Sequence, residues 1–347
     1  MNKMPTINTL DDVRQILTEL PGPDVEAARA AQTREPQLTK PAGSLGRLEQ
    51  LAAWTATWQG RYPPRMTTPN AHVFAGNHGV VAQGVSAFPA EVTKQMVANF
   101  ERGGAAINQI CKSIGIGLCV EQMDLDNPTQ DFTQNPAMTD TECADAIAFG
   151  MNVVDECSDV VCLGEMGIGN TTSAAAICLA LYGGSALTWV GPGTGLDKPG
   201  IGKKADVIGL GVKLYKPHMH DGLDVMRCLG GRELAAIAGA VIGARLKKVP
   251  VLLDGYVSTA AAAVLPSVNK RALDHCKVGH MSQEPGHKLL LEKLGKVALQ
   301  DHSMRLGEGT GAALAVALLK AAVACHNDMA TFAEAGVSDK DAGEKDA

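Results

Sequence analysis

Aromatic residues are scarce in this sequence, and basic residues are not in excess. Only 4% of its 347 residues are Phe, Trp or Tyr, and the formal net charge is −6. Few stacking side chains and no basic excess argue against a nucleic-acid-binding protein. We therefore expect the partner to be a small molecule.

Long hydrophobic runs and paired cysteine motifs are also missing. The N-terminal stretch MNKMPTINTLDD has no apolar core of a secretion signal, and Lys320 interrupts the most apolar C-terminal stretch before it reaches bilayer length. The nine cysteines include no CxxC pair. This usage predicts a soluble cytoplasmic protein with reduced thiols and no membrane segment.

The histidines do not form a recognisable metal motif. His218 and His220 lie two positions apart, and His275 is followed by Cys276 with His280 nearby. Neither group has a further carboxylate or cysteine at ligand spacing, so surface or hydrogen-bonded core histidines are the preferred interpretation. We expect no metal and no cofactor.

The first sixty residues carry helical patterns and no strand pattern. Thr9–Asp12 resembles a capping box, Pro21–Pro23 ends the first helix, and a second helix is expected over Val25–Gln32. The amphipathic stretch RLEQLAAWTATWQG follows. This region is expected to form a helical cap or a small domain.

From Ala71 onward, short apolar runs alternate with glycine loops and helices. The runs are His72–Ala75, Leu118–Met123, Val160–Leu163, Leu187–Val190 and Pro250–Leu253. Continuous hydrophobicity is typical of strands covered on both faces. The pattern predicts an α/β fold, a doubly wound and mostly parallel sheet with glycine-rich loops at the C-terminal ends of its strands, where ligands bind.

Glu308 is the candidate catalytic residue. It lies between Gly307 and Gly309, directly before the apolar run Ala312–Leu319. Glycines allow positive φ and close approach of a ligand, and the first turn of a helix favours negative charge. The alternative is a glutamate that only caps the helix. A second stretch of this design, Gly164–Thr172, contains Glu165.

Two glycine loops are candidate phosphate sites. Gly164–Thr172 opens a helix whose start is rich in side-chain donors, and Gly191–Gly195 is followed by Lys203 and Lys204. Neither loop has the lysine pattern of an ATP-binding loop. Tight turns and solvated lysines are the alternatives. Together with the two glutamates, the loops suggest transfer chemistry on a phosphorylated small molecule.

Several motifs resemble those of the nicotinate-nucleotide:dimethylbenzimidazole phosphoribosyltransferase family. They run in order from about Lys40 to Val337 and read KPAGSLGRLE, GNHGVVAQGVSAFP, GGAAIN, GEMGIGNTTSAAA, GPGTGLD, DGYVSTAAA, SQEPGH and RLGEGTGAALA. So many ordered motifs are far more specific than any single glycine loop.

The resemblance implies a reaction and an architecture. Nicotinate mononucleotide and 5,6-dimethylbenzimidazole would give α-ribazole 5′-phosphate and nicotinate, in assembly of the cobalamin lower ligand, without a metal. It also implies a homodimer whose chains have a large α/β domain and a small helical domain. The expected ranges are 1–65 and 311–337 for the small domain, 66–310 for the large domain and 338–347 for a loose polar tail.

The resemblance also assigns site residues. Glu308, framed by Gly307 and Gly309, would be the base, and Glu165 would hold it or offset charge on the ribose. The residues expected to hold the 5′-phosphate and ribose are Gly167, Gly169, Asn170, Thr171, Thr172, Gly193, Thr194, Gly195 and Lys204. Ser86, Phe88 and Gln95 would form walls around the aromatic base, with ordinary packing as the alternative.

Two departures from the family pattern concern substrate affinity. Asn77 stands where many relatives carry aspartate, and Pro192 stands where many carry arginine. Competing hypotheses are a phosphoribosyltransferase with another acceptor, such as adenine, benzimidazole or a phenol, and a non-catalytic nucleotide-binding sensor.

Overall fold

The computed structural model describes residues 4–338, which form two compact units. The larger unit contains the described residues up to Pro21 and Thr68–Ala315. The smaller unit contains Gly22–Thr67 and the described residues from Val316 onward, so helix α14 (Thr310–Asp328) is divided between the units. The polar tail expected at 338–347 lies, apart from its first residue, outside the described residues.

A six-stranded parallel sheet forms the centre of the larger unit, as predicted. Its strand order is β2-β1-β3-β4-β5-β6. The order reverses between β1 and β3, and in such sheets this switch point is where ligands bind. The strands are β1 (Pro69–Ala75), β2 (Gly117–Gln122), β3 (Val160–Met166), β4 (Val251–Leu253), β5 (Cys276–His280) and β6 (Ala298–Gln300).

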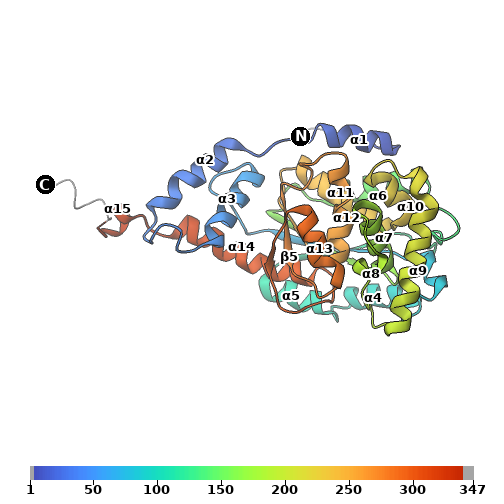
Figure 1. Ribbon diagram of the computed structural model, residues 1–347. Coiled ribbons are helices and arrows are strands. Elements are labelled where there is room, and N and C mark those ends of the chain that lie inside the picture. Colours follow the sequence, from blue (N-terminus) through green and yellow to red (C-terminus); the bar gives the residue numbers. More distant parts are fainter. Residues whose placement is uncertain (1–3, 339–347) are drawn as a thin grey trace. The chain divides into compact units, whose positions relative to one another are not determined.

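Helices surround this sheet (Figure 1). On one face, Val97 of α4 packs with Ala75 and Val120; on the other, Phe74 joins the main core. The helices of the larger unit are α1 (Leu10–Thr18), α4 (Glu91–Glu101), α5 (Ala106–Ile114), α6 (Asp140–Val153), α7 (Asn170–Tyr182), α8 (Ala186–Trp189), α9 (Lys198–Tyr215), α10 (Gly222–Leu229), α11 (Arg232–Leu246), α12 (Tyr256–Ala262) and α13 (Pro285–Leu294). The doubly wound α/β class is thus confirmed.

Helices α6 and α11 pack backbone to backbone. A Cβ atom added at Gly150 would lie 1.8 Å from the carbonyl oxygen of Ala236, and one added at Gly239 would lie 2.0 Å from that of Ile147. Small residues at these positions let the two helices approach closely, and both bury apolar side chains in the main core.

Two of the predicted strands differ from the structure. Leu187–Val190 was expected to be a strand, but Ala186–Trp189 is the short helix α8. The amides of Thr188 and Val190 donate to the carbonyls of Ser185 and Ala186, so the segment forms a helical turn. Periodicity does not distinguish strand from helix in so short an apolar run. Strand β3 continues to Met166, past the expected end at Leu163.

The first helix does not belong to the smaller unit, contrary to the expected range 1–65. Its capping box is present, because Thr9 accepts from the Asp12 amide and Asp12 accepts from the Thr9 amide. However, its apolar face of Leu10, Val13 and Leu17 lies in the main core of the larger unit. Hydrophobic burial therefore decides its membership.

The smaller unit contains α2 (Val25–Arg34), α3 (Arg47–Gln59), the later part of α14 and α15 (Phe332–Ala335). Lys40 forms ion pairs with Glu35 and Glu49 at 3.0 and 2.7 Å. Among the described residues, α14 is the one helix long and apolar enough to span a membrane by length and composition alone, and 56% of its most apolar window is buried in the protein.

Candidate active site

The C-terminal edge of the sheet gathers the acidic residues of the larger unit's loops. Glu165 is the next-to-last residue of β3, and Asp254 follows β4 directly. The loop between β6 and α14 brings Glu308 to the same edge, where its amide donates to the carbonyl oxygen of Glu165 at 3.2 Å. The two glutamates singled out in the sequence are therefore neighbours.

Glu308 has a left-handed backbone conformation. Its φ is 64°, between Gly307 at 83° and Gly309 at 85°. For a residue with a side chain this conformation costs about 1–2 kcal/mol. A Cβ atom added at Gly164 would lie 2.3 Å from the Gly309 nitrogen, so glycine is required where β3 meets the loop.

Asp254 fixes the loop that carries Glu308. It is 1% exposed, and its two carboxylate oxygens accept from the Gly309 amide at 3.1 Å and the Ala312 amide at 2.9 Å. These amides belong to the start of α14, where free N–H groups favour a negative charge. Asp254 thereby positions Glu308.

The Glu308 carboxyl is buried and only partly satisfied. It is 6% exposed, and its Oε2 has no hydrogen-bond partner among the described residues. Burial raises its pKa to about 7; a bond from the Ile107 amide opposes this, and the Asp254 carboxylate adds to it. A carboxylate with this pKa and a free oxygen is suited to accept a proton near neutral pH.

Glu165 has an even higher pKa. Burial raises the pKa to about 8, against a hydrogen bond from the Asn170 side chain, and nearby Asp254, Glu233 and Glu308 add negative charge. Burial thus raises the pKa of Glu165 more than that of Glu308, so Glu165 carries a proton at neutral pH more often than Glu308 does.

A buried histidine–glutamate pair packs against the loop after β3. His78 contacts Glu233 through Nε2 at 2.5 Å and Ser173 through Nδ1 at 3.1 Å. Glu233 is fully buried, and Gly76 and Gly167 pack against its side chain. Sequence reasoning did not select His78 or Glu233; the motif containing His78 was the available indication.

Lys204, Thr171 and the loop Gly191–Gly195 come together at the other end of the site. Lys204 is 1% exposed, and its Nζ donates to Thr171 Oγ1 at 2.7 Å. A Cβ atom added at Gly193 would lie 3.2 Å from that nitrogen. Burial lowers the pKa of Lys204 to about 8, with Glu284 opposing the shift. We call this group of residues the lysine cradle.

Further side chains border the lysine cradle. Arg305 donates to the Gly193 carbonyl at 2.9 Å, and Ser86 Oγ lies 3.4 Å from Thr194 Oγ1. Arg305 was not selected from the sequence, although it lies three positions before Glu308 in the RLGEGTGAALA motif.

The remaining predicted residues occupy less uniform positions. Phe88 is 49% exposed and Gln95 lies exposed on α4. Thr172 is fully buried, and its hydroxyl has no partner among the described residues. Gly169, with φ 93°, caps the start of α7, and Gly195 has no neighbour within 4 Å of an added Cβ atom.

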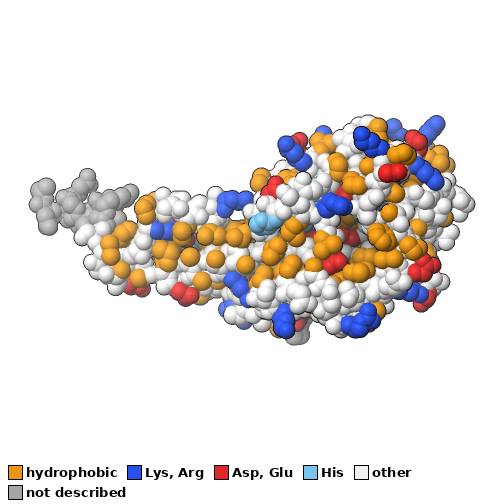
Figure 2. Space-filling model, turned by 90° about the horizontal axis from the view of Figure 1, so that it is seen from below, with side chains coloured by type: hydrophobic (Ala, Val, Ile, Leu, Met, Phe, Trp, Pro, Cys, Tyr) orange, Lys and Arg blue, Asp and Glu red, His pale blue; other side chains and the backbone are white. Residues whose placement is uncertain are grey.

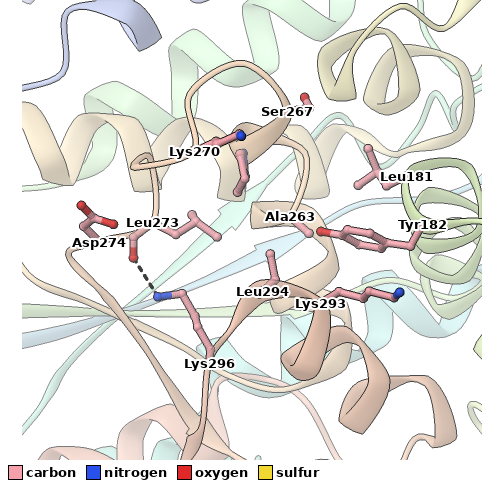
Figure 3. Close-up of a pocket in the computed structure, with 11 residues that line it drawn as sticks. Leu181, Tyr182, Ala263, Ser267, Lys270, Leu273, Asp274, Lys293, Leu294 and Lys296 are labelled. Carbon is pink, nitrogen blue, oxygen red and sulfur yellow. Dashed lines mark hydrogen bonds between the residues drawn. The ribbon is translucent and has the colours of Figure 1, made fainter.

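Two further features of the surface can be followed in Figures 2 and 3. Figure 2 shows basic side chains standing singly among acidic and hydrophobic ones on the face that it draws. A pocket of about 390 Å³, shown in Figure 3, lies at the opposite edge of the sheet, because its residues Asp274 and Lys296 precede β5 and β6. Lys296 there donates to the carbonyls of Leu273 and Cys276 at 2.8 Å.

The fold and the site define the class of protein. The sequence profile of the phosphoribosyltransferase family matches residues 20–337, and the chain belongs to that family. It is 57% identical to the nicotinate-nucleotide–dimethylbenzimidazole phosphoribosyltransferase of Rhizobium meliloti (strain 1021), over 95% of this chain and 98% of the relative. The protein of that name from Brucella canis is 56% identical over 94% of this chain and 97% of its own.

A solved structure agrees with these relatives. The crystal structure of nicotinate-nucleotide-dimethylbenzimidazole phosphoribosyltransferase from Thermus thermophilus has a TM-score of 0.84 and 39% sequence identity to this chain. The alignment of the two structures covers 91% of this chain and 99% of the Thermus chain. The family resemblance drawn from the sequence motifs is confirmed.

Proposed function

We propose that this enzyme transfers 5-phosphoribose from nicotinate mononucleotide to 5,6-dimethylbenzimidazole. The products are α-ribazole 5′-phosphate and nicotinate, and the step serves assembly of the cobalamin lower ligand. Two relatives named nicotinate-nucleotide–dimethylbenzimidazole phosphoribosyltransferase are 57% identical to this chain over 95% of its length. The observation that carries the mechanism is the buried Glu308 carboxyl with its free Oε2.

The chemistry requires one base. One nitrogen of dimethylbenzimidazole forms a bond to C1′ of the ribose while the bond from C1′ to the pyridinium nitrogen breaks. Nicotinate keeps that electron pair and leaves with a neutral ring nitrogen, so it needs no acid. The other nitrogen of the acceptor loses its proton, which Glu308 accepts. Attack opposite the leaving ring converts the β linkage to α.

The pKa of Glu308 suits this role. At about 7, it leaves a large share of the carboxyl ionised at neutral pH while keeping it a stronger base than an exposed glutamate. Asp254 holds the loop through two amides, so the free oxygen has a fixed position.

The other predicted residues have roles consistent with their places. Lys204 and Thr171, with the loop Gly193–Gly195, would bind the 5′-phosphate, because a cation and hydroxyl beside free helix amides suit a phosphate. Glu165, protonated more often than Glu308, would hydrogen-bond the ribose or offset its charge. Ser86, Phe88 and Gln95 would border the aromatic acceptor.

The assembly and compartment belong to the same proposal. We propose that the protein is a homodimer in the cytoplasm. Light scattering of the purified protein checks the dimer. Two other functions compete. A different acceptor is a matter of pocket walls, since one methyl group changes selectivity by about 1–3 kcal/mol. A nucleotide sensor would have no use for a strained Glu308 whose Oε2 has no partner among the described residues.

The decisive experiment mixes purified protein with nicotinate mononucleotide and dimethylbenzimidazole and separates the products by chromatography. We expect nicotinate and α-ribazole 5′-phosphate in equal amounts. Loss of the nucleotide without ribazole phosphate would indicate hydrolysis instead. Binding without any turnover would support the sensor. Parallel reactions with adenine, benzimidazole and phenol rank the acceptors by kcat/KM.

A further inference from the structure

Strand pairing brings three metal-binding residue types together outside the candidate active site. Residues His72 on β1 and Cys119 on β2 are direct partners in the parallel ladder, and Phe74 pairs with Glu121. Because side chains alternate along a strand, Cys119 and Glu121 point to the same face as His72. The transfer chemistry uses none of the three.

Their ligand atoms already lie close together. A ring nitrogen of His72, the Sγ atom of Cys119 and a carboxylate oxygen of Glu121 all lie within 4.8 Å of one another. The Nδ1 atom of His72 is 2.9 Å from the Glu121 oxygen. His72 is buried, Glu121 is half-buried and Cys119 is exposed, so one side of the group faces solvent.

The spacing suits a small tetrahedral ion. Zinc bonds to nitrogen, oxygen and sulfur of about 2.0–2.3 Å imply donor atoms about 3.3–3.7 Å apart. To bind zinc, the distance between the His72 nitrogen and the Glu121 oxygen would increase slightly, and the Cys119 sulfur would move closer to both atoms. Rotation of the exposed Cys119 and the half-buried Glu121 supplies both changes, while the strands hold the Cα atoms.

The face of β2 that carries this group is accessible. Val120, which alternates to the opposite face, packs with Val97 of α4. Helices α4 and α5 both contact β2. Cys119 remains exposed on its own face, where an ion can enter and a water molecule can complete its coordination.

We propose that His72, Cys119 and Glu121 form a zinc-binding site with a fourth position open to water. One nitrogen, one sulfur and one oxygen donor match the mixed ligand sets that zinc accepts. The site is separate from the phosphoribosyl transfer. No pattern in the sequence indicated this zinc site, because His72 and Cys119 are far apart along the chain and meet only through strand pairing.

Zinc titration of the purified, chelator-treated protein tests the proposal. Competition with a chromophoric zinc chelator should give one tight site per chain. Cys119→Ser should weaken binding by at least about 100-fold, since loss of outer-shell partners alone costs about 10- to 100-fold. Glu121→Gln should weaken it as well. Cys157→Ser, which removes another exposed thiol, is the matched control and should bind like the parent protein.

Cobalt(II) gives a second, spectroscopic measurement. Bound to the parent and to Cys157→Ser, it should show a thiolate-to-cobalt charge-transfer band that Cys119→Ser lacks. Circular dichroism of the metal-free variants checks that each is folded. Absence of a tight site, or equal affinity in the parent and Cys119→Ser, would leave a histidine–glutamate ion pair beside an ordinary thiol and overturn the proposal.

Discussion

The two ends of the candidate active site use burial in opposite ways. At the acidic end, burial raises the pKa of Glu308 to about 7. At the lysine cradle, burial lowers the pKa of Lys204 to about 8. In both cases burial removes hydration from the charged form. The pKa of the carboxyl therefore rises toward 7, and the pKa of the ammonium falls toward 7.

The ends differ in how their polar atoms are satisfied. Lys204 donates to Thr171, whereas Glu308 Oε2 has no partner among the described residues and Glu308 has a strained backbone. A group that binds substrate can hold a substitute partner until the substrate arrives. The proposed base needs a free lone pair, and the left-handed backbone at Glu308 lowers the stability of the fold.

The largest effect is expected for Glu308→Gln. The amide keeps the size of the side chain but cannot accept the acceptor's proton, so kcat should fall by about 100- to 10,000-fold while nicotinate mononucleotide still binds. Steady-state kinetics and calorimetric titration measure the two effects. Glu292→Gln, on the exposed side of α13, is the control. Undiminished turnover would remove Glu308 from its role.

A smaller effect is expected at the lysine cradle. Lys204→Met removes the proposed charged hydrogen bond to phosphate, which is worth about 1.5–3 kcal/mol, so kcat/KM should fall by about 10- to 150-fold, mainly through KM. Lys203→Met, at the exposed neighbouring residue, should change little. A loss confined to kcat would assign Lys204 to the chemical step instead of binding.

The pH profile separates the two ends. Since Glu308 must be ionised, kcat/KM should rise about tenfold per pH unit up to about 7. Since Lys204 must be protonated, it should fall above about 8. The phosphate of the substrate, with a second pKa of about 6, is titrated separately.

The alkaline limb has two candidate sources. Lys204→Met should flatten it if the lysine is responsible. A limb that persists in this variant would belong to Glu165, whose pKa is also raised to about 8.

The smallest effect concerns stability. Glu308→Gly relieves the left-handed backbone, and this relief of strain by itself should raise the free energy of unfolding by about 1–2 kcal/mol. The pKa rises from 4.5 to about 7 on folding, so the protonated side chain's contribution is present below pH 4.5 and lost as pH rises through 7. Urea unfolding should therefore show a larger gain at high pH than at low pH.

Ser303→Gly is the control for the stability measurement. Ser303 also has a left-handed φ, 56°, but carries no carboxyl. Its gain should be independent of pH. Equal gains at all pH values for Glu308→Gly would mean that strain alone, and not the buried carboxyl, limits stability at this position.

Sequence patterns predicted much of the fold for identifiable reasons. The run VVCLG is continuously apolar, which is typical of a strand buried on both faces, and it forms β3. Leu187–Val190 looked similar but is too short for periodicity to distinguish strand from helix. The amphipathic pattern of α1 correctly predicted a helix, but no local pattern states which core will receive its apolar face.

The sequence by itself determined the chemical types: the glycine-framed Glu308, the donors at the start of α7, and motifs specific enough to indicate the family. These are local properties, since glycine spacing and helix caps depend on neighbours in the chain. Only the tertiary structure decided that Asp254 holds the Glu308 loop, that Lys204 is buried against Thr171, and that Cys119 lies beside His72. Such pairings depend on strand order and burial, which join residues far apart in the chain and set the pKa values on which the chemistry depends.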